Sequence, residues 1–239
     1  MFKEKGARSF IKMLSWRVVA TFTTMILVYI FVGKVKIAAA VGALEVVTKM
    51  ILYYLHERVW DKTNIGRYEK KAFVLWFTGL PCSGKSTIAD MVYDFLVKKG
   101  YKTERLDGDT VREVFPQTGF SKEQRDEHIK RIGFLASMLE KNGVITISSF
   151  VSPYEEPREF AKELCDNFIE VYVSTPAEEC EKRDVKGMYK KAREGEIKNF
   201  TGVSDPYEVP KNPDIIIDAH EESPGESFRR IKKYMYKYM

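Results

Sequence analysis

The sequence predicts an α/β fold in which helices cover both faces of a parallel sheet, preceded by a transmembrane helical hairpin. Three observations support this prediction. Two apolar runs occupy the first 55 residues, strand-like and helix-like stretches alternate beyond residue 72, and a glycine-rich turn follows the first of those strands. We therefore divide the 239 residues into a two-helix membrane domain over 1–58, a linker over 59–71 and an α/β domain over 72–239.

The two apolar runs extend over residues 13–32 and 37–55. As a helix the second run would span roughly 28 Å, close to the thickness of a bilayer core. Lysines and arginines outside the pair outnumber the two lysines of the connecting turn, so both ends should be cytoplasmic. This predicts a multi-pass protein of the cell membrane with its larger domain in the cytoplasm. The alternatives are a signal peptide, or two helices in a soluble core or on a membrane surface.

Charge is divided unevenly along the chain. Residues 1–71 hold 13 Lys/Arg and 5 Asp/Glu, whereas residues 72–239 hold 26 and 29. Because the basic excess accompanies apolar runs, it indicates a membrane surface rather than a nucleic-acid partner. Glu45 and Lys49 interrupt the second run at a spacing that permits an ion pair, or a polar contact for a partner or a transported ion. The three cysteines form no C-x-x-C pair and are typical of reduced thiols.

Five strand-like stretches are the candidate strands, namely 73–78, 103–106, 144–150, 168–173 and 215–218. Capping boxes that begin at Ser121, Thr175 and Ser223 mark helix starts between or after them. Alternation of this kind predicts a parallel sheet, and ligands of such sheets bind at the carboxyl ends of the strands.

The turn after the first strand has the pattern G-x-x-x-x-G-K-S, which is typical of a loop that wraps around phosphate groups. Its glycines allow successive N–H groups to point inward, its lysine can reach the terminal phosphates, and Ser86 can hold Mg²⁺. A helix over 87–99 adds its positive end to the same place. We therefore predict ATP as the cofactor, bound by Gly79, Leu80, Pro81, Cys82, Ser83, Gly84, Lys85, Ser86 and Thr87.

Polar residues also follow later strands. Asp107 and Asp109 flank a glycine after the second strand, where they can orient the water ligands of Mg²⁺ or accept a proton, and Arg112 can bind an anion. Ser152 follows the third strand. Residues 185–200 are rich in lysine and arginine and predict either a mobile lid over the nucleotides or a solvated helix.

Several motifs in residues 72–217 resemble the adenylylsulfate (APS) kinase family. They include Leu106-Asp-Gly-Asp-x-Val-Arg112, Ser149-Phe-Val-Ser-Pro-Tyr154 and Lys190-Lys-Ala-Arg-x-Gly-Glu-Ile-Lys-Asn-Phe-Thr-Gly202, in addition to the phosphate-binding turn. The resemblance implies a nucleoside-kinase-like fold of the P-loop class. It also implies a step of sulfate activation, in which the ATP γ-phosphate is transferred to the ribose 3′-hydroxyl of adenylyl sulfate. Residues 1–58 resemble two-helix membrane domains of unknown function, on the strength of Arg8-Ser-x-x-Lys-x-x-Ser-Trp-Arg17 and Glu45.

The same resemblance implies roles for single residues. Lys85 and a Mg²⁺ held by Ser86 and Asp107 would neutralise charge. Asp107 would orient the water ligands of the metal or act as the base, and Asp109 would support the substrate. Ser152 could relay the phosphoryl group, although direct transfer is the simpler route. Binding of the acceptor falls to Arg112, Phe120, Arg125, His128, Arg131, Lys198 and Phe200. His128 stands where the family usually has Asn, and the stretch over 113–118 is shorter than usual.

Two other functions remain open at this stage. The departures at His128 and 113–118 suggest a kinase for another anionic nucleotide or sugar. The hairpin suggests a nucleotide-binding regulatory subunit of a membrane protein. Copies of the chain could also assemble as a homodimer.

Overall fold

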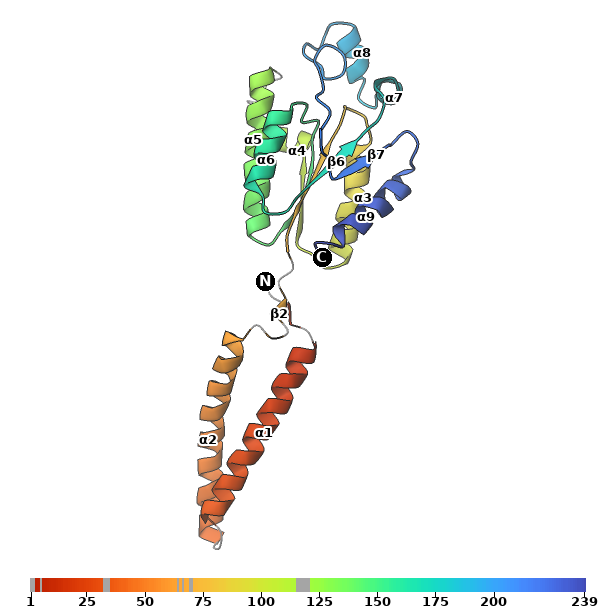
Figure 1. Cartoon of the computed structure of the whole chain (residues 1–239). Helices are drawn as coiled ribbons and strands as arrows, with labels where there is room; N and C mark the ends of the chain where they lie inside the picture. The colour runs from red at the N-terminus through yellow and green to blue at the C-terminus, as the bar shows by residue number, and fades with distance from the viewer. Residues whose placement is uncertain are drawn as a thin grey trace. The chain divides into compact units, whose positions relative to one another are not determined.

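The computed structural model describes residues 3–4, 6–31, 35–63, 65, 67–68, 71–114 and 121–239, and Figure 1 draws the whole chain. The chain separates into two compact units, Met1–Lys70 and Lys71–Met239. Each unit has its own secondary structure, so each is described by itself.

The first unit is a helical hairpin. Helix α1 (Gly6–Phe31) and helix α2 (Val35–Lys62) pack against each other, and the short strand β1 (Lys3–Glu4) pairs antiparallel with β2 (Arg67–Tyr68). Glu45 and Lys49 form an ion pair within α2, and Thr24 of α1 donates a hydrogen bond of 3.1 Å to Glu45 Oε1. The pair therefore takes part in the contact between the two helices.

The predicted location in the cell membrane is wrong. None of the helices in the described part of the chain contains a stretch long and apolar enough to cross a bilayer. The two runs are long enough to cross a bilayer, but polar side chains within them lower their mean hydropathy. Arg17, Thr23 and Thr24 interrupt the first run, and Glu45 and Lys49 interrupt the second, so each lowers the apolar character of its helix.

The second unit contains a five-stranded parallel sheet, which confirms the predicted α/β architecture. Its strands are β3 (Val74–Thr78), β4 (Thr103–Asp107), β5 (Ile145–Ser149), β6 (Phe168–Val173) and β7 (Ile215–Ile217), in the order β4-β5-β3-β6-β7. The central strand β3 is buried throughout, which explains its continuous apolar sequence. The loop after β3 thus lies between the ends of β5 and β6.

Helices cover both faces of this sheet (Figure 1). Helices α3 (Lys85–Lys98) and α9 (Pro224–Met235) pack on one face, with Ile88, Val92 and Ile231 fully buried. Helices α4 (Gly108–Val114), α5 (Lys122–Lys141) and α6 (Glu155–Leu164) cover the other face, around Trp76 and Ile132. Helices α7 (Ala177–Arg183) and α8 (Met188–Arg193) contribute to a small separate apolar cluster.

Two of the three expected capping boxes are formed. Ser121 caps α5 and Ser223 caps α9, each with the residue three positions later. The expected box at Thr175 is not formed, because its hydroxyl donates instead to the carbonyl oxygen of Ser83 at 3.0 Å. This hydrogen bond ties the end of β6 to the loop after β3.

Gly133 allows α5 and α6 to approach closely. A Cβ atom at this position would lie 2.6 Å from Ala161 Cβ and 2.9 Å from Ala161 Cα. We expect Gly133→Ala to lower the free energy of unfolding by about 1–3 kcal/mol, because the two helices must separate. Gly225→Ala in α9 is the matched control, since nothing lies within 4 Å of its added Cβ. Urea denaturation measures both, and equal effects would contradict the close approach.

Candidate active site

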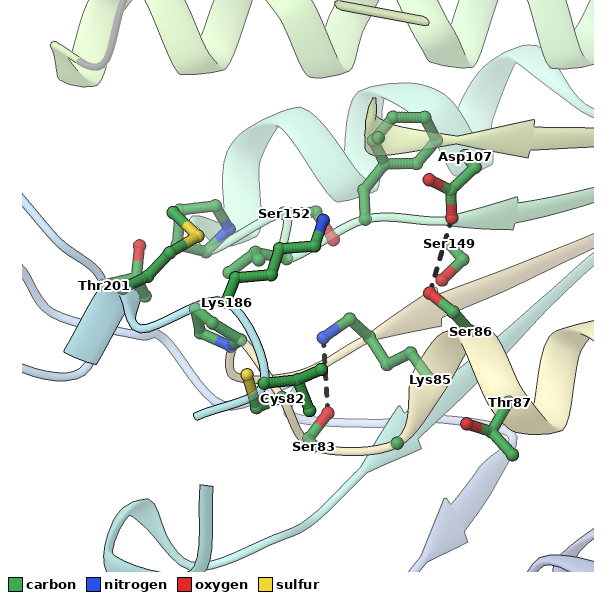
Figure 2. Close-up of a pocket in the computed structure, with 18 of the residues that line it drawn as sticks. Cys82, Ser83, Lys85, Ser86, Thr87, Asp107, Ser149, Ser152, Lys186 and Thr201 are labelled. Carbon is green, nitrogen blue, oxygen red and sulfur yellow. Dashed lines mark hydrogen bonds between the residues drawn. The ribbon is translucent and has the colours of Figure 1, made fainter. Parts of the chain in front are cut away.

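A cavity of about 780 Å³ opens at the carboxyl ends of the parallel strands. Its lining includes the loop after β3, the start of α3, and residues that follow β4, β5 and β7 (Figure 2). Polar residues lining it include Lys85, Ser86, Asp107, Arg112, Arg125, His128, Ser149, Ser152, Arg183, Lys186 and Glu222. Residues from distant parts of the chain are therefore gathered at the edge where a parallel sheet binds its ligands.

The loop after β3 has a backbone that its glycines make possible. Gly79 has φ +149°, and a Cβ atom there would lie only 2.6 Å from the carbonyl oxygen of Val173. Gly84 has φ +100° and immediately precedes α3. Cys82 also has a positive φ of 60°. The loop thus turns sharply from the sheet into a helix N-terminus that faces the cavity.

Lys85 folds back over this loop. Its Nζ donates hydrogen bonds to the carbonyl oxygens of Gly79 at 2.9 Å and Leu80 at 2.6 Å. It also donates to Ser83 Oγ at 3.3 Å (Figure 2). Burial lowers the pKa of Lys85 to about 8, although nearby Cys180, Cys82 and Asp107 oppose this shift. A buried ammonium group held by uncharged acceptors is well suited to bind an anion.

Ser86 and Asp107 lie next to each other beside Lys85. Ser86 Oγ donates to Asp107 Oδ2 at 3.4 Å (Figure 2). Arg105 donates to the same carboxylate oxygen at 3.3 Å and to Asp90 Oδ1 at 3.1 Å. One hydroxyl and one oriented carboxylate therefore face the cavity, which is the oxygen chemistry that Mg²⁺ prefers. No cluster of three or more His, Cys, Asp or Glu side chains occurs among the residues that the structure describes.

The residues predicted to bind the acceptor separate into three groups. Arg112, Arg125, His128 and Phe200 line the cavity. Arg131 and Lys198 are exposed and are not part of that lining, and Arg131 pairs with Glu127. Phe120 and the side chain of Asp109 lie outside the described residues.

Arg125 connects α5 to the segment after α8. Its Nη1 donates to Thr201 Oγ1 at 2.7 Å and to Asp205 Oδ2 at 2.9 Å, and its Nη2 donates to the carbonyl oxygen of Asn199. Tyr154 donates to the same Asp205 oxygen at 2.5 Å. The guanidinium is thus anchored, and it holds this segment, which includes Phe200, at the cavity.

His128 is the most unusual group in the cavity wall. It is 2% exposed, and neither ring nitrogen has a hydrogen-bond partner. Its ring packs edge-on against Phe150, with centroids 5.9 Å apart. Burial, together with the positive charges of Arg112 and Arg131, lowers the pKa of His128 to about 4. The ring is therefore neutral at physiological pH, with two unused polar atoms.

Ser152 belongs to a buried chain of hydroxyl groups. It is 2% exposed and has φ 38°. Its Oγ accepts a hydrogen bond from Trp76 Nε1 at 3.2 Å and donates to Thr78 Oγ1 at 2.9 Å. Tyr207 contacts the same threonine oxygen at 2.9 Å. The hydroxyl is thus engaged by the protein itself, at the wall of the cavity.

Sequence reasoning missed one end of the cavity. Arg183 of α7 donates to the carbonyl oxygens of Ser83 at 3.3 Å and Ala219 at 2.7 Å, and Glu222 and Ser227 lie in the same wall. The capping box at Ser223 could have revealed this region. It places a helix start just after the last strand, where a parallel sheet binds ligands. Lys186, Asn199 and Phe200, from the basic stretch 185–200, also line the cavity.

The chain is similar in sequence and in structure to known proteins. The family model described as adenylylsulphate kinase matches residues 71–218, and one described as a predicted membrane protein matches residues 10–61. The adenylyl-sulfate kinase of Halothermothrix orenii is 50% identical over 167 residues, which cover 70% of this chain and 90% of the relative. A probable adenylyl-sulfate kinase of Pseudomonas aeruginosa is 53% identical over 164 residues, 68% of this chain and 77% of the relative.

A solved structure is also similar. The APS kinase of Mycobacterium tuberculosis in complex with AMPPNP and APS superimposes with a TM-score of 0.67 and 37% identity, over 70% of this chain and 98% of that one. All three relatives share residues of the α/β unit, which holds the cavity.

Proposed function

The chain is an enzyme of the adenylylsulphate kinase family, and we propose that it transfers the γ-phosphate of ATP to the ribose 3′-hydroxyl of adenylyl sulfate. The products would be ADP and 3′-phosphoadenylyl sulfate. The observation that carries this proposal is one cavity whose lining includes Lys85 and the N-terminus of α3 as well as Arg112 and His128. A donor phosphate and an anionic acceptor can therefore meet in the same cavity.

The donor side is built for a triphosphate. Backbone N–H groups of residues 82–87, which include the start of α3, would surround the β- and γ-phosphates. Lys85 would exchange its contacts with Gly79 and Leu80 for phosphate oxygens, which are stronger acceptors because they are charged. Arg183, Ala219 and Glu222, beyond the loop, would surround the nucleoside. Phosphoryl transfer depends mainly on such positioning and charge neutralisation.

Mg²⁺ fits the oxygen atoms beside Lys85. Ser86 Oγ and the Asp107 carboxylate would hold the ion, directly or through its water ligands. When bound, the ion supplies positive charge to the phosphate oxygens. Arg105 keeps the Asp107 carboxylate in place through its 3.3 Å hydrogen bond.

The acceptor side would hold adenylyl sulfate through charge and stacking. Arg112 offers a cation, His128 offers hydrogen bonds from a neutral ring, and Phe200 offers an aromatic face. Arg125 is a positioning residue here, because its guanidinium holds the segment that contains Phe200. Asp107 or Asp109 would accept the proton of the 3′-hydroxyl as the phosphate is transferred. The engaged hydroxyl of Ser152 favours direct transfer over a relay.

The test is a comparison of acceptors. We expect the purified full-length chain with ATP and Mg²⁺ to release ADP together with 3′-phosphoadenylyl sulfate when adenylyl sulfate is present. AMP and phosphorylated sugars should give much less ADP. Chromatography of the nucleotides measures all products at once. Turnover with a sugar or another nucleotide, but not with adenylyl sulfate, would contradict the proposed acceptor.

A further inference from the structure

The Asp205 carboxylate joins three separate segments at the cavity. Its Oδ2 accepts a hydrogen bond from Arg125 of α5 at 2.9 Å and one from the hydroxyl of Tyr154, the residue before α6, at 2.5 Å. Arg125 is 6% exposed and Tyr154 is 5% exposed, so water competes little for these contacts. We call these three residues the clamp. One carboxylate oxygen thus attaches the segment after α8 to both α5 and the loop after β5.

Residues 200–205 form one tight turn, so the position of Asp205 also sets that of Phe200. The carbonyl oxygen of Phe200 accepts hydrogen bonds from the N–H groups of residues 203, 204 and 205 at 3.1, 3.0 and 3.1 Å. The N–H group of Phe200 donates in turn to Ser204 Oγ at 2.9 Å. Phe200 and Thr201 of this turn line the cavity. The clamp therefore holds a part of the cavity wall.

Phe200 is also connected to the loop that would hold the donor phosphates. Its ring packs edge-on against the ring of Tyr189, with centroids 4.9 Å apart. The Tyr189 hydroxyl donates to the carbonyl oxygen of Pro81, in the loop after β3, at 3.1 Å. A shift of the turn would therefore change where the aromatic wall lies relative to the donor loop.

We propose that Tyr154 and Asp205 are positioning residues for the acceptor, because they hold Phe200 where the ribose of adenylyl sulfate meets the γ-phosphate of ATP. This inference rests on the proposed function. Burial and the hydrogen bond to Asp205 raise the pKa of Tyr154 to about 12, so its hydroxyl remains a donor at physiological pH. Arg125 balances the charge of Asp205, so the clamp brings no unpaired carboxylate toward an anionic substrate.

Two tyrosines allow a matched test. Tyr154 donates to Asp205, and Tyr234 of α9 donates in the same way to Asp214 at 2.8 Å but is not among the described residues that line the cavity. Tyr154→Phe and Tyr234→Phe each remove one hydroxyl and no charge. In Tyr154→Phe, kcat/KM for adenylyl sulfate should fall about 10-fold or more while the KM for ATP stays unchanged. Tyr234→Phe should keep both values.

A double-mutant cycle tests whether the clamp acts as a unit. Asp205→Asn should also lower kcat/KM for adenylyl sulfate, and adding Tyr154→Phe to it should cause little further loss, because both changes remove the same contact. Urea denaturation of all variants measures what each substitution costs the fold. An activity loss that follows stability equally in Tyr154→Phe and Tyr234→Phe would show a structural role and overturn the inference.

Two further results have different meanings. If the original chain phosphorylates adenylyl sulfate and Tyr154→Phe has unchanged kinetics, or if the two clamp substitutions are fully additive, the inference alone is overturned. If the original chain gives no product from adenylyl sulfate, the proposed function is overturned and this inference with it.

Discussion

Lys85→Ala should lower the rate of phosphoryl transfer about 10²–10³-fold without weakening the fold. In the structure this lysine is buried, and its three hydrogen-bond acceptors are uncharged. Its lowered pKa, about 8, shows that the folded protein disfavours the ammonium ion in the absence of an anion. Removing the charge therefore relieves a cost of folding, while it removes the group that neutralises the transferring phosphate.

Two measurements separate these effects. Steady-state formation of ADP and 3′-phosphoadenylyl sulfate gives kcat and KM, and urea denaturation gives the free energy of unfolding. We expect that free energy to stay equal or to rise. Lys98→Ala, an exposed position at the end of the same helix, is the control and should leave both quantities unchanged. A variant that loses activity only in proportion to lost stability would show that Lys85 has a structural role instead.

His128→Asn should remove a large part of the protein's acid sensitivity. The pKa of His128 is about 4 in the folded protein, against 6.5 for an ordinary histidine. Below pH 6.5 the unfolded chain binds a proton that the folded chain does not, so stability falls as the pH falls toward 4. Over that window the loss is about 3 kcal/mol. Asparagine keeps a polar side chain but does not titrate. On acidification, the His128→Asn variant should therefore lose about 3 kcal/mol less of its free energy of unfolding than the original chain.

Urea denaturation at pH 7 and pH 4.5 measures this difference. His220→Asn, which removes an exposed imidazole, serves as the control and should keep the acid sensitivity of the original chain. An unchanged acid sensitivity in His128→Asn would mean that the ring is not buried in its neutral form. The same variant also tests the acceptor site. If His128 donates to or accepts from adenylyl sulfate, the KM for that substrate should change more than the KM for ATP.

The sequence alone determined the α/β architecture and the phosphate-binding loop. Strands β3, β6 and β7 are short, largely apolar runs, so the sequence of each run already indicates that it is buried. The loop is also local, because nine consecutive residues contain the glycines, the lysine and the hydroxyl that the turn requires. Capping by Ser121 and Ser223 could be predicted for the same reason, since cap and partner are three residues apart.

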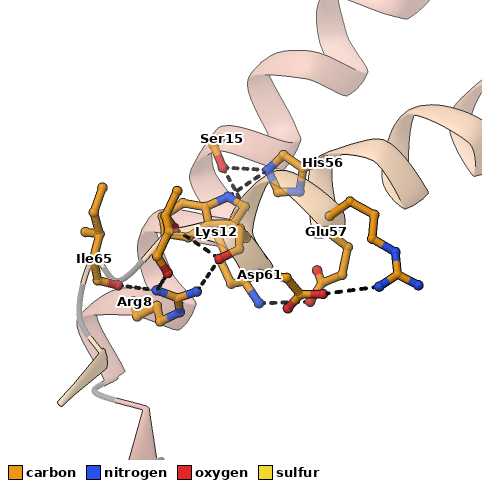
Figure 3. A network of polar contacts seen from close by, with 10 residues as sticks. Arg8, Lys12, Ser15, His56, Glu57, Asp61 and Ile65 are labelled. Atoms are coloured by element: carbon orange, nitrogen blue, oxygen red, sulfur yellow. Dashed lines mark hydrogen bonds and ion pairs between the residues drawn. The ribbon is translucent and has the colours of Figure 1, made fainter. Parts of the chain in front are cut away.

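Only the tertiary structure decided which side chains reach the cavity. Arg125 and Arg131 look equivalent in sequence, yet Arg125 is anchored by Asp205 and Arg131 is exposed. Their directions depend on how α5 packs, which no local pattern records. The same holds for His128, whose buried ring nitrogens have no hydrogen-bond partner. It also holds for Arg183, which contacts the loop after β3 although Ser83 is 100 residues earlier in the sequence. In the hairpin, apolar runs suggested a membrane span, whereas helix pairing placed polar side chains such as Arg8 and Lys12 in the contact between the helices (Figure 3). Local spacing determines elements and loops, while contacts between distant segments determine burial, charge and side-chain direction.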